Sequence, residues 1–135
     1  MKHLKVIFCL VVMGAILSCS KEEEPIRLNK NTMYISNNGG SDTIMVLNYH
    51  QICLSGEAKV HLNDSVFWVR SEQNTQYQEQ FEVEGGWFKI IVPYKTPNLI
   101  VASIEEGKLN PDDNVHIIVG ISNADKFGRI EIKSK

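Results

Sequence analysis

Apolar residues that alternate with polar ones are the feature that most constrains the fold of this chain. From Ile26 onward they recur at every second position rather than every third and fourth, and β-branched and aromatic residues are common. A period of two is typical of a strand with one buried face, because successive side chains of a strand point to opposite sides. Around residues 43–49, for example, Ile44 and Val46 share one face, and Met45 and Leu47 share the other. We therefore expect strands, and no helix, from Ile26 onward.

About eight or nine short strands are expected from this pattern, with turn residues roughly every eight to twelve positions. Their expected positions are residues 32–36, 43–49, 59–62, 66–70, 81–84, 87–92, 98–104, 115–121 and 129–133. Residues 71–80 are mostly polar and lack this period, so we expect them to form a mobile loop. Short strands with regularly spaced turns favour two packed antiparallel sheets over βαβ units. The predicted fold class is therefore an all-β, antiparallel β-sandwich.

Glycine and asparagine mark the predicted turns, because both residues tolerate positive φ. The run Asn37-Asn38-Gly39-Gly40 separates the first two expected strands, and Asn63-Asp64 separates the third from the fourth. Gly85-Gly86 is predicted to be the two-residue turn of a hairpin that joins residues 81–84 to residues 87–92.

The first residues of the chain have a different composition. Lys2 and Lys5 precede a stretch without charge, residues 6–17, which ends just before Ser18-Cys19. A positive start, an apolar run and a small residue before the cleavage point are the layout of a secretory signal. The apolar run would span roughly 18 Å as a helix, less than the ~30 Å hydrocarbon core of a membrane. The sequence therefore predicts a signal peptide over residues 1–18.

Cysteine directly after Leu-Ser resembles the lipobox of bacterial lipoproteins, in which the signal is cut before the cysteine. This resemblance implies that Cys19 is the lipid attachment site and that its acyl chains hold the protein on a membrane. The acidic residues 19–25 that follow resemble the export signal of surface-exposed lipoproteins in the Bacteroidetes, and they also suit an extended, solvated tether. We expect a lipid anchor in the outer membrane, with the domain exposed at the cell surface or, alternatively, facing the periplasm.

Length and charge limit what the remaining chain can be. Removal of residues 1–18 leaves 117 of 135 residues, which suits one domain, residues 26–135, behind the tether. Lys2 and Lys5 leave with the signal, so 12 basic residues face 16 acidic ones. An acidic balance argues against a nucleic-acid partner, which would require a basic face. Cys53 is left without a disulfide partner, since Cys9 lies in the signal and Cys19 is expected to be acylated.

Three segments resemble, in the same order, parts of BACON-like domains, the immunoglobulin-like modules of Bacteroidetes surface proteins. Residues 35–44 resemble the first hairpin of these domains, and residues 86–93 resemble the strand before their C-terminal half. Residues 99–106 and 127–132 resemble their closing pair of strands. The resemblance covers about residues 26–135 and implies an immunoglobulin-like β-sandwich. It also implies a non-catalytic domain that acts beside glycan-degrading machinery and binds mucin or other glycans.

A metal site and an active site are both poorly supported by the residues. His50, Cys53 and His61 could suggest zinc, but no second pair of ligands at close spacing completes a four-ligand cage. Cys53 lies between apolar neighbours and has no protease signature around it. Glu82 and Glu84 could form the carboxylate pair of a glycosidase, yet the strand pattern explains them as solvent-facing residues. The sequence therefore predicts no enzyme, no cofactor and no metal.

Aromatic residues are the better candidates for binding, because sugars stack their apolar faces on flat rings. Trp87 follows the Gly85-Gly86 turn, and Tyr94 lies between two prolines. Trp68 is adjacent to Phe67, so alternation sends one of the two inward and the other outward. We predict Trp87, Tyr94 and Trp68 as ligand-binding candidates, with a glycan as the expected ligand. The alternative is a structural or protein-interaction subunit of a surface complex, which would dock by a strand edge or a loop.

Overall fold

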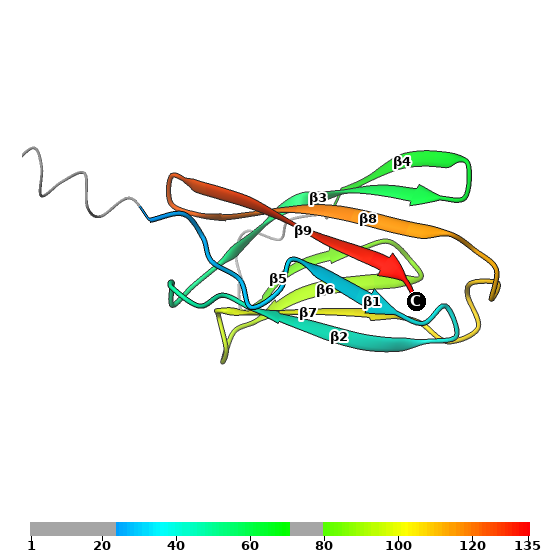
Figure 1. Ribbon diagram of the computed structural model, residues 1–135, viewed down its shortest axis with the longest axis horizontal. Coiled ribbons are helices and arrows are strands. Elements are labelled where there is room, and N and C mark those ends of the chain that lie inside the picture. Colours follow the sequence, from blue (N-terminus) through cyan, green and yellow to red (C-terminus); the bar gives the residue numbers. More distant parts are fainter. Residues whose placement is uncertain (1–23, 71–79) are drawn as a thin grey trace, which may run out of the picture.

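A computed structural model describes residues 24–70 and 80–135, with the side chains of Gln80 and Phe81 left aside (Figure 1). The predicted signal peptide, Cys19 and residues 71–79 of the predicted loop lie outside the described residues. No helix in the described ranges is long and apolar enough to cross a membrane.

The described chain consists of strands joined by turns and loops, which confirms the all-β prediction. Its strands are β1 (Thr32–Ile35), β2 (Gly40–Met45), β3 (Cys53–Leu62), β4 (Ser65–Arg70), β5 (Gln80–Glu84), β6 (Phe88–Pro93), β7 (Leu99–Ile104), β8 (Val115–Asn123) and β9 (Lys126–Ser134).

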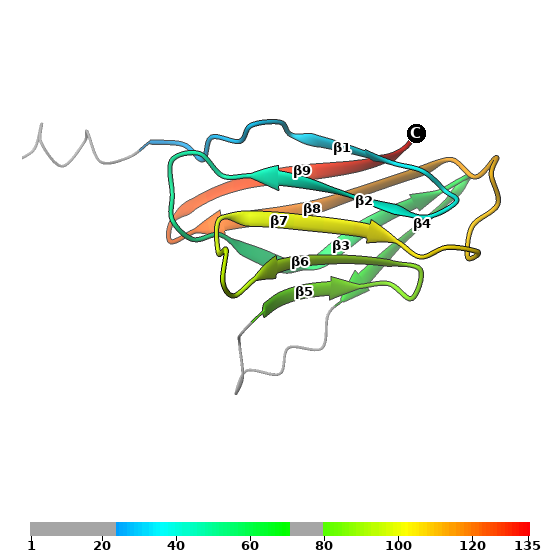
Figure 2. The ribbon, with the colours of Figure 1, turned by 90° about the horizontal axis from the view of Figure 1, so that it is seen from below.

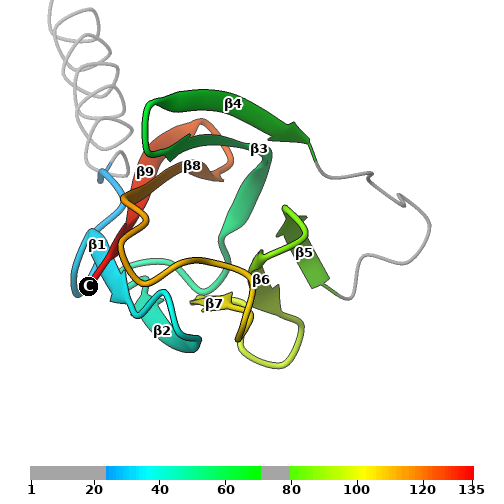
Figure 3. The same ribbon diagram turned by 90° about the vertical axis from the view of Figure 1, so that its right-hand side faces the viewer.

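Two sheets pack face to face as a β-sandwich (Figures 2 and 3). One sheet has the strand order β1-β9-β8-β3-β4, and the other has the order β2-β7-β6-β5. The neighbours β3, β8 and β9 correspond to strands C, F and G of an immunoglobulin domain, and β2, β7 and β6 correspond to B, E and D. The immunoglobulin-like sandwich expected from the sequence is therefore the observed fold.

One strand pair differs from the expected antiparallel arrangement. β1 pairs with β9 in parallel, with Thr32 opposite Glu131 and Ile35 opposite Ser134. The β8–β9 hairpin determines the direction of β9, and β1 runs in the same direction along its free edge before the chain crosses to the second sheet at Asn37–Gly39 (Figure 2). The other strand pairs are antiparallel.

The core lies between the two sheets, and alternation along the strands builds it. In β8 every second residue from Val115 to Ile121 is buried, and β6 and β7 show the same period. Its largest members with less than 2% exposure are Met33, Ile44, Ile52, Ile90, Ile100, Ile117, Ile130 and Ile132. Burial of each such side chain contributes roughly 1.5–3 kcal/mol, so this set is the main stabilising feature of the domain.

β2 ends earlier than the sequence pattern suggests, although its predicted faces are confirmed. Ile44 and Val46 are buried, whereas Met45 and Leu47 are exposed. Beyond Met45 the backbone leaves the ladder with β7: the Val46 N–H donates to the Asn98 carbonyl oxygen at 2.9 Å, and Val46 also bridges to Leu28. The strand expected over residues 43–49 therefore ends at Met45, and Val46 pairs with the segment before β1 instead.

Candidate functional site

The sandwich has two ends, and its turns are divided between them (Figures 1 and 2). One end holds the N-terminal segment near Glu24, together with the connection between β2 and β3 and the β6–β7 and β8–β9 turns. The other, which we call the distal end, holds residues 36–39, 63–64, 85–87 and 105–114. The distal end therefore lies opposite Glu24, where the described chain begins.

Asn37 organises the distal end by holding the loop of residues 105–114. It is 7% exposed, and its Nδ2 lies 3.2, 3.2 and 2.7 Å from the carbonyl oxygens of Asn110, Pro111 and Asp113. Three carbonyl groups of one loop therefore converge on a single side-chain amide. Its Oδ1 is buried and has no hydrogen-bond partner among the described residues.

Asp113 belongs to the same loop and connects it by a hydrogen bond to the β3–β4 turn. One carboxylate oxygen accepts a hydrogen bond from Asn63 Nδ2 at 3.0 Å, and the other accepts one from the Asn110 N–H at 2.8 Å. These two bonds, that of Asn63 first, favour the ionised form and lower the pKa of Asp113 below its usual range. Asn63 Oδ1 also accepts from the Asn114 N–H at 2.9 Å, so the β3–β4 turn and the loop form one hydrogen-bonded unit.

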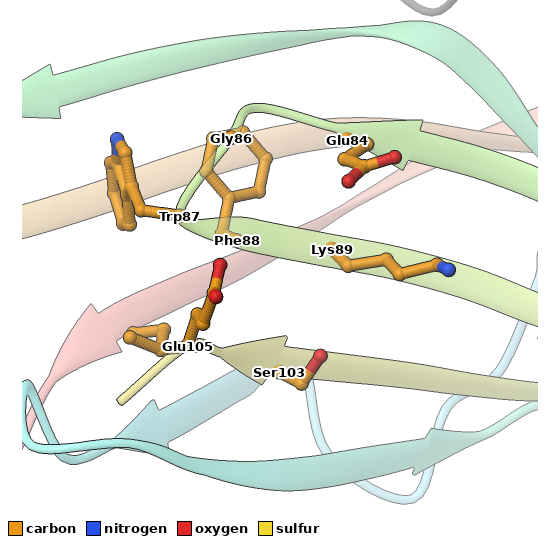
Figure 4. A pocket seen from close by; sticks show the side chains of 8 residues that line it. Glu84, Gly86, Trp87, Phe88, Lys89, Ser103 and Glu105 are labelled. Atoms are coloured by element: carbon orange, nitrogen blue, oxygen red, sulfur yellow. The ribbon is translucent and has the colours of Figure 1, made fainter. Parts of the chain in front are cut away.

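A pocket of about 260 Å³ opens at the distal end of the four-stranded sheet (Figure 4). The residues that line it are Glu84, Gly86, Trp87, Phe88, Lys89, Ser103, Ile104 and Glu105. Figure 4 shows the rings of Trp87 and Phe88 at the start of β6, with the Glu105 carboxylate reaching toward them from the end of β7. The Glu105 N–H donates to the Trp87 carbonyl oxygen at 2.9 Å, which connects the pocket to the 105–114 loop.

Trp87 lies in the β5–β6 turn rather than in the following strand, which corrects the expected position of that turn. The Gly85 N–H donates to the Phe88 carbonyl oxygen at 3.0 Å, and the ladder closes at Glu84 and Lys89. Gly86 and Trp87 are therefore the central turn residues, and Gly86 has a φ of 88°. Because Trp87 lies in the turn and not in the strand, its indole lines the pocket. There it packs edge-to-face on Phe88, with ring centroids 4.8 Å apart.

The charges around the pocket are predominantly negative. Lys89 is paired with Glu82 at 3.1 Å and points away along the sheet (Figure 4). Glu84 and Glu105 are exposed, and among the described residues no ion pair involves them. An indole, two carboxylates and the Ser103 hydroxyl thus surround one opening, a combination that can stack a sugar ring and accept hydrogen bonds from its hydroxyls.

The three aromatic candidates from the sequence do not converge. Trp87 is half-buried in the distal pocket, whereas Tyr94 is 67% exposed in the turn at the opposite end of β6. Trp68 is 63% exposed and lies on β4 of the other sheet. Phe67 lies on the core side of that sheet, opposite the buried Val60, but it is still 37% exposed because β4 is an edge strand. Alternation therefore predicted that Phe67 and Trp68 face opposite sides of the sheet, but not that both are exposed.

The remaining polar candidates lie apart from the pocket. Cys53 is a free, half-buried thiol, and burial raises its pKa, which disfavours the reactive thiolate. His61 stacks on His116 across β3 and β8 with centroids 5.6 Å apart, and His116 Nε2 lies 3.1 Å from Glu131 Oε1. Within residues 24–70 and 80–135, no group of three or more His, Cys, Asp or Glu residues could hold a metal ion.

Comparison with known proteins supports the fold alone. No protein family matches this sequence, and no curated protein matches it either. An NMR structure of a protein from Bacteroides thetaiotaomicron is similar in fold. The match has a TM-score of 0.52 at 18% sequence identity and covers 84% of this chain and 88% of that chain. The resemblance to BACON-like domains stays a prediction, because no family match tests it.

Proposed function

We propose that this protein is a non-enzymatic binding module of a bacterial cell surface and that its Trp87 pocket takes a glycan. The observation that carries this proposal is the Trp87 indole, which lines an open pocket at the distal end together with a hydroxyl and two carboxylates that form no ion pair among the described residues. The BACON-like resemblance of the sequence supports the same function. The hydrogen bond from the Glu105 N–H to the Trp87 carbonyl oxygen and the edge-to-face contact of Trp87 with Phe88 preform the pocket. This suits recognition, because a preformed site loses little conformational entropy on binding.

The charge of the pocket makes the ligand class more specific. Glu84 and Glu105 repel anionic groups, so neutral glycans are favoured over sulfated or sialylated ones. The full-length chain, purified in detergent, is therefore expected to bind the neutral polysaccharides of a panel more tightly than the anionic ones.

Trp87→Ala is expected to weaken glycan binding by about tenfold or more, which corresponds to the loss of one stacked ring, roughly 1.4 kcal/mol. Tyr94→Ala is the matched control, since it removes an exposed aromatic ring at the opposite end of β6. Binding to immobilised glycans is measured for both variants, with thermal melting to show that each is folded. Equal loss in the two variants, or no saturable binding by the parent chain, would overturn the proposal.

The proposed location is the outer membrane, where the lipid on Cys19 would anchor the protein and expose it at the surface. Cys19→Ser is expected to move the protein from the membrane fraction to the soluble fraction, because no acyl chain remains to insert. Protease treatment of intact cells then separates the two orientations: digestion indicates surface exposure, and protection indicates the periplasmic face. Membrane retention of the Cys19→Ser variant would contradict the lipid anchor.

A second candidate function is a protein-interaction subunit, which the exposed strand β4 favours. Natural sheets protect their edges, whereas Val66, Phe67 and Trp68 are all exposed on this one. The two functions use different surfaces and can be tested separately.

A further inference from the structure

β4 is a bare apolar edge of the five-stranded sheet. Among the described residues it pairs with β3 alone, and Val69 is its one residue that is not exposed. Val66, Phe67 and Trp68 are 54%, 37% and 63% exposed. Figure 3 shows β4 at the rim of its sheet, beyond β3. Pairing with β3 uses only one side of the strand, so within residues 24–70 and 80–135 no strand pairs with the backbone N–H and C=O groups on its other side.

The other sheet edges carry features that discourage strand pairing. β1 has four residues, and β5 carries Glu82 and Glu84. β2 is partly covered by the segment before β1, where Lys30 Nζ lies 2.7 Å from Asp42 Oδ2. β4 contains no proline and no charged residue before Arg70. It is therefore the edge of this domain that is best suited to bind another strand.

The geometry points to β4 of a second copy of this chain as the occupant, paired antiparallel about a two-fold axis perpendicular to the sheet. In the register centred on Phe67, this residue faces Phe67 of the second copy, and Val66 faces Trp68. Arg70 then faces Asp64 of the second copy at both ends of the pairing. An isologous contact of this kind closes at two chains, because each copy uses its edge fully.

Charge complementarity selects this register. Asp64 is exposed in the β3–β4 turn, and the Arg70 side chain is 80% exposed. Arg70 Nε contacts Glu57 Oε1 at 2.8 Å, which leaves further guanidinium N–H groups for a second carboxylate. The alternative register, centred on Trp68, places Arg70 opposite Val66 and offers it no acid. The centre of the proposed contact is an aromatic pair, which stabilises adjacent antiparallel strands.

The symmetry of the pairing has a consequence for anchored copies. A two-fold axis perpendicular to the sheet reverses the strand direction, so the two N-terminal segments leave from opposite ends of the dimer. If Cys19 is lipidated as proposed, the pairing suits copies on two facing membranes. This interaction is independent of glycan binding, since β4 and the Trp87 pocket lie on different sheets.

Charge reversal tests the register directly on the full-length chain in detergent. Asp64→Arg or Arg70→Asp alone creates like-charge contacts and is expected to weaken dimerisation by about tenfold, measured by density-matched sedimentation equilibrium. The double variant Asp64→Arg/Arg70→Asp restores the opposite charges and should dimerise like the parent chain. Thermal melting shows whether each variant is folded.

Cysteine crosslinking provides a second measurement of the same contact. Phe67→Cys should form a disulfide-linked dimer on oxidation, because residue 67 faces its own copy across the axis. Ser65→Cys is the matched control, since residue 65 faces Val69 in this register, and the parent chain accounts for Cys53. A monomeric parent chain, a double charge variant as weak as the single ones, or equal crosslinking at residues 65 and 67 would each overturn the proposal.

Discussion

Asn37→Asp is expected to lower the free energy of unfolding by about 3–5 kcal/mol at pH 7, the cost of an uncompensated buried charge. The substitution replaces the Nδ2 donor by an oxygen that faces the carbonyl groups of Asn110, Pro111 and Asp113. Three bonds to the 105–114 loop then become repulsive contacts. Because this loop contributes Glu105 to the Trp87 pocket, glycan binding is expected to weaken with stability.

The same variant should show a distinctive pH dependence. Burial and the three carbonyl dipoles raise the pKa of the new carboxyl group above its unfolded value of about 3.9. The variant is therefore most stable below about pH 3.9, where the new carboxyl group is protonated in the folded and the unfolded state. Its free energy of unfolding falls as the pH rises through the folded pKa. Asn38→Asp is the matched control, since Asn38 is exposed in the same turn. Urea unfolding of both variants between about pH 3.5 and 8 should show a gap between their free energies of unfolding that widens as the pH rises. A constant gap would contradict this explanation.

Gly85→Ala is the second large effect, expected to cost about 1–3 kcal/mol by overpacking the β5–β6 turn. A Cβ atom at this position would lie 2.0 Å from Phe88 Cε1 and 2.4 Å from Phe88 Cζ. The Phe88 ring is 3% exposed and packs on Trp87, so it cannot move without disturbing the core and the pocket together. Denaturant unfolding measures the loss of stability, and glycan binding should fall in the same variant.

A double-mutant cycle separates this clash from a general effect of alanine in the turn. Phe88→Leu removes the ring atoms that the new methyl group would contact. Gly85→Ala should therefore cost less in the Phe88→Leu background than in the parent chain, by about 1 kcal/mol or more. An equal cost in both backgrounds would show that the loss comes from the turn backbone and not from Phe88.

Much of the architecture could be predicted because strand periodicity is a local property. The alternation at Ile44 and Val46, the turn residues Asn37–Gly40 and Asn63-Asp64, and the paired strands around Gly85 are all readable over a few positions. The parallel pairing of β1 with β9 was missed, since it joins residues about a hundred positions apart and leaves no mark on either strand's own pattern.

The candidate site was predicted less well. The position of Trp87 after two glycines makes it a candidate in the sequence, but its place in the turn depends on the hydrogen bond from the Gly85 N–H to the Phe88 carbonyl oxygen. Ser103 and Glu105 come from β7 and the loop after it, and no spacing in the sequence relates them to Trp87. Asn37 was recognised as a turn former, whereas its bonds to a loop more than seventy residues away were not.

The sequence by itself determined that this domain is built from strands, which faces of them are apolar and where most turns fall, because these properties depend on neighbouring residues. Only the tertiary structure decided which aromatic residues reach solvent. Trp87, Tyr94 and Trp68 look alike in sequence but lie in a pocket, at the opposite end and on a sheet edge. Exposure depends on what the facing sheet and the neighbouring strands cover, and β4 is an edge strand whose apolar residues Val66, Phe67 and Trp68 stay exposed.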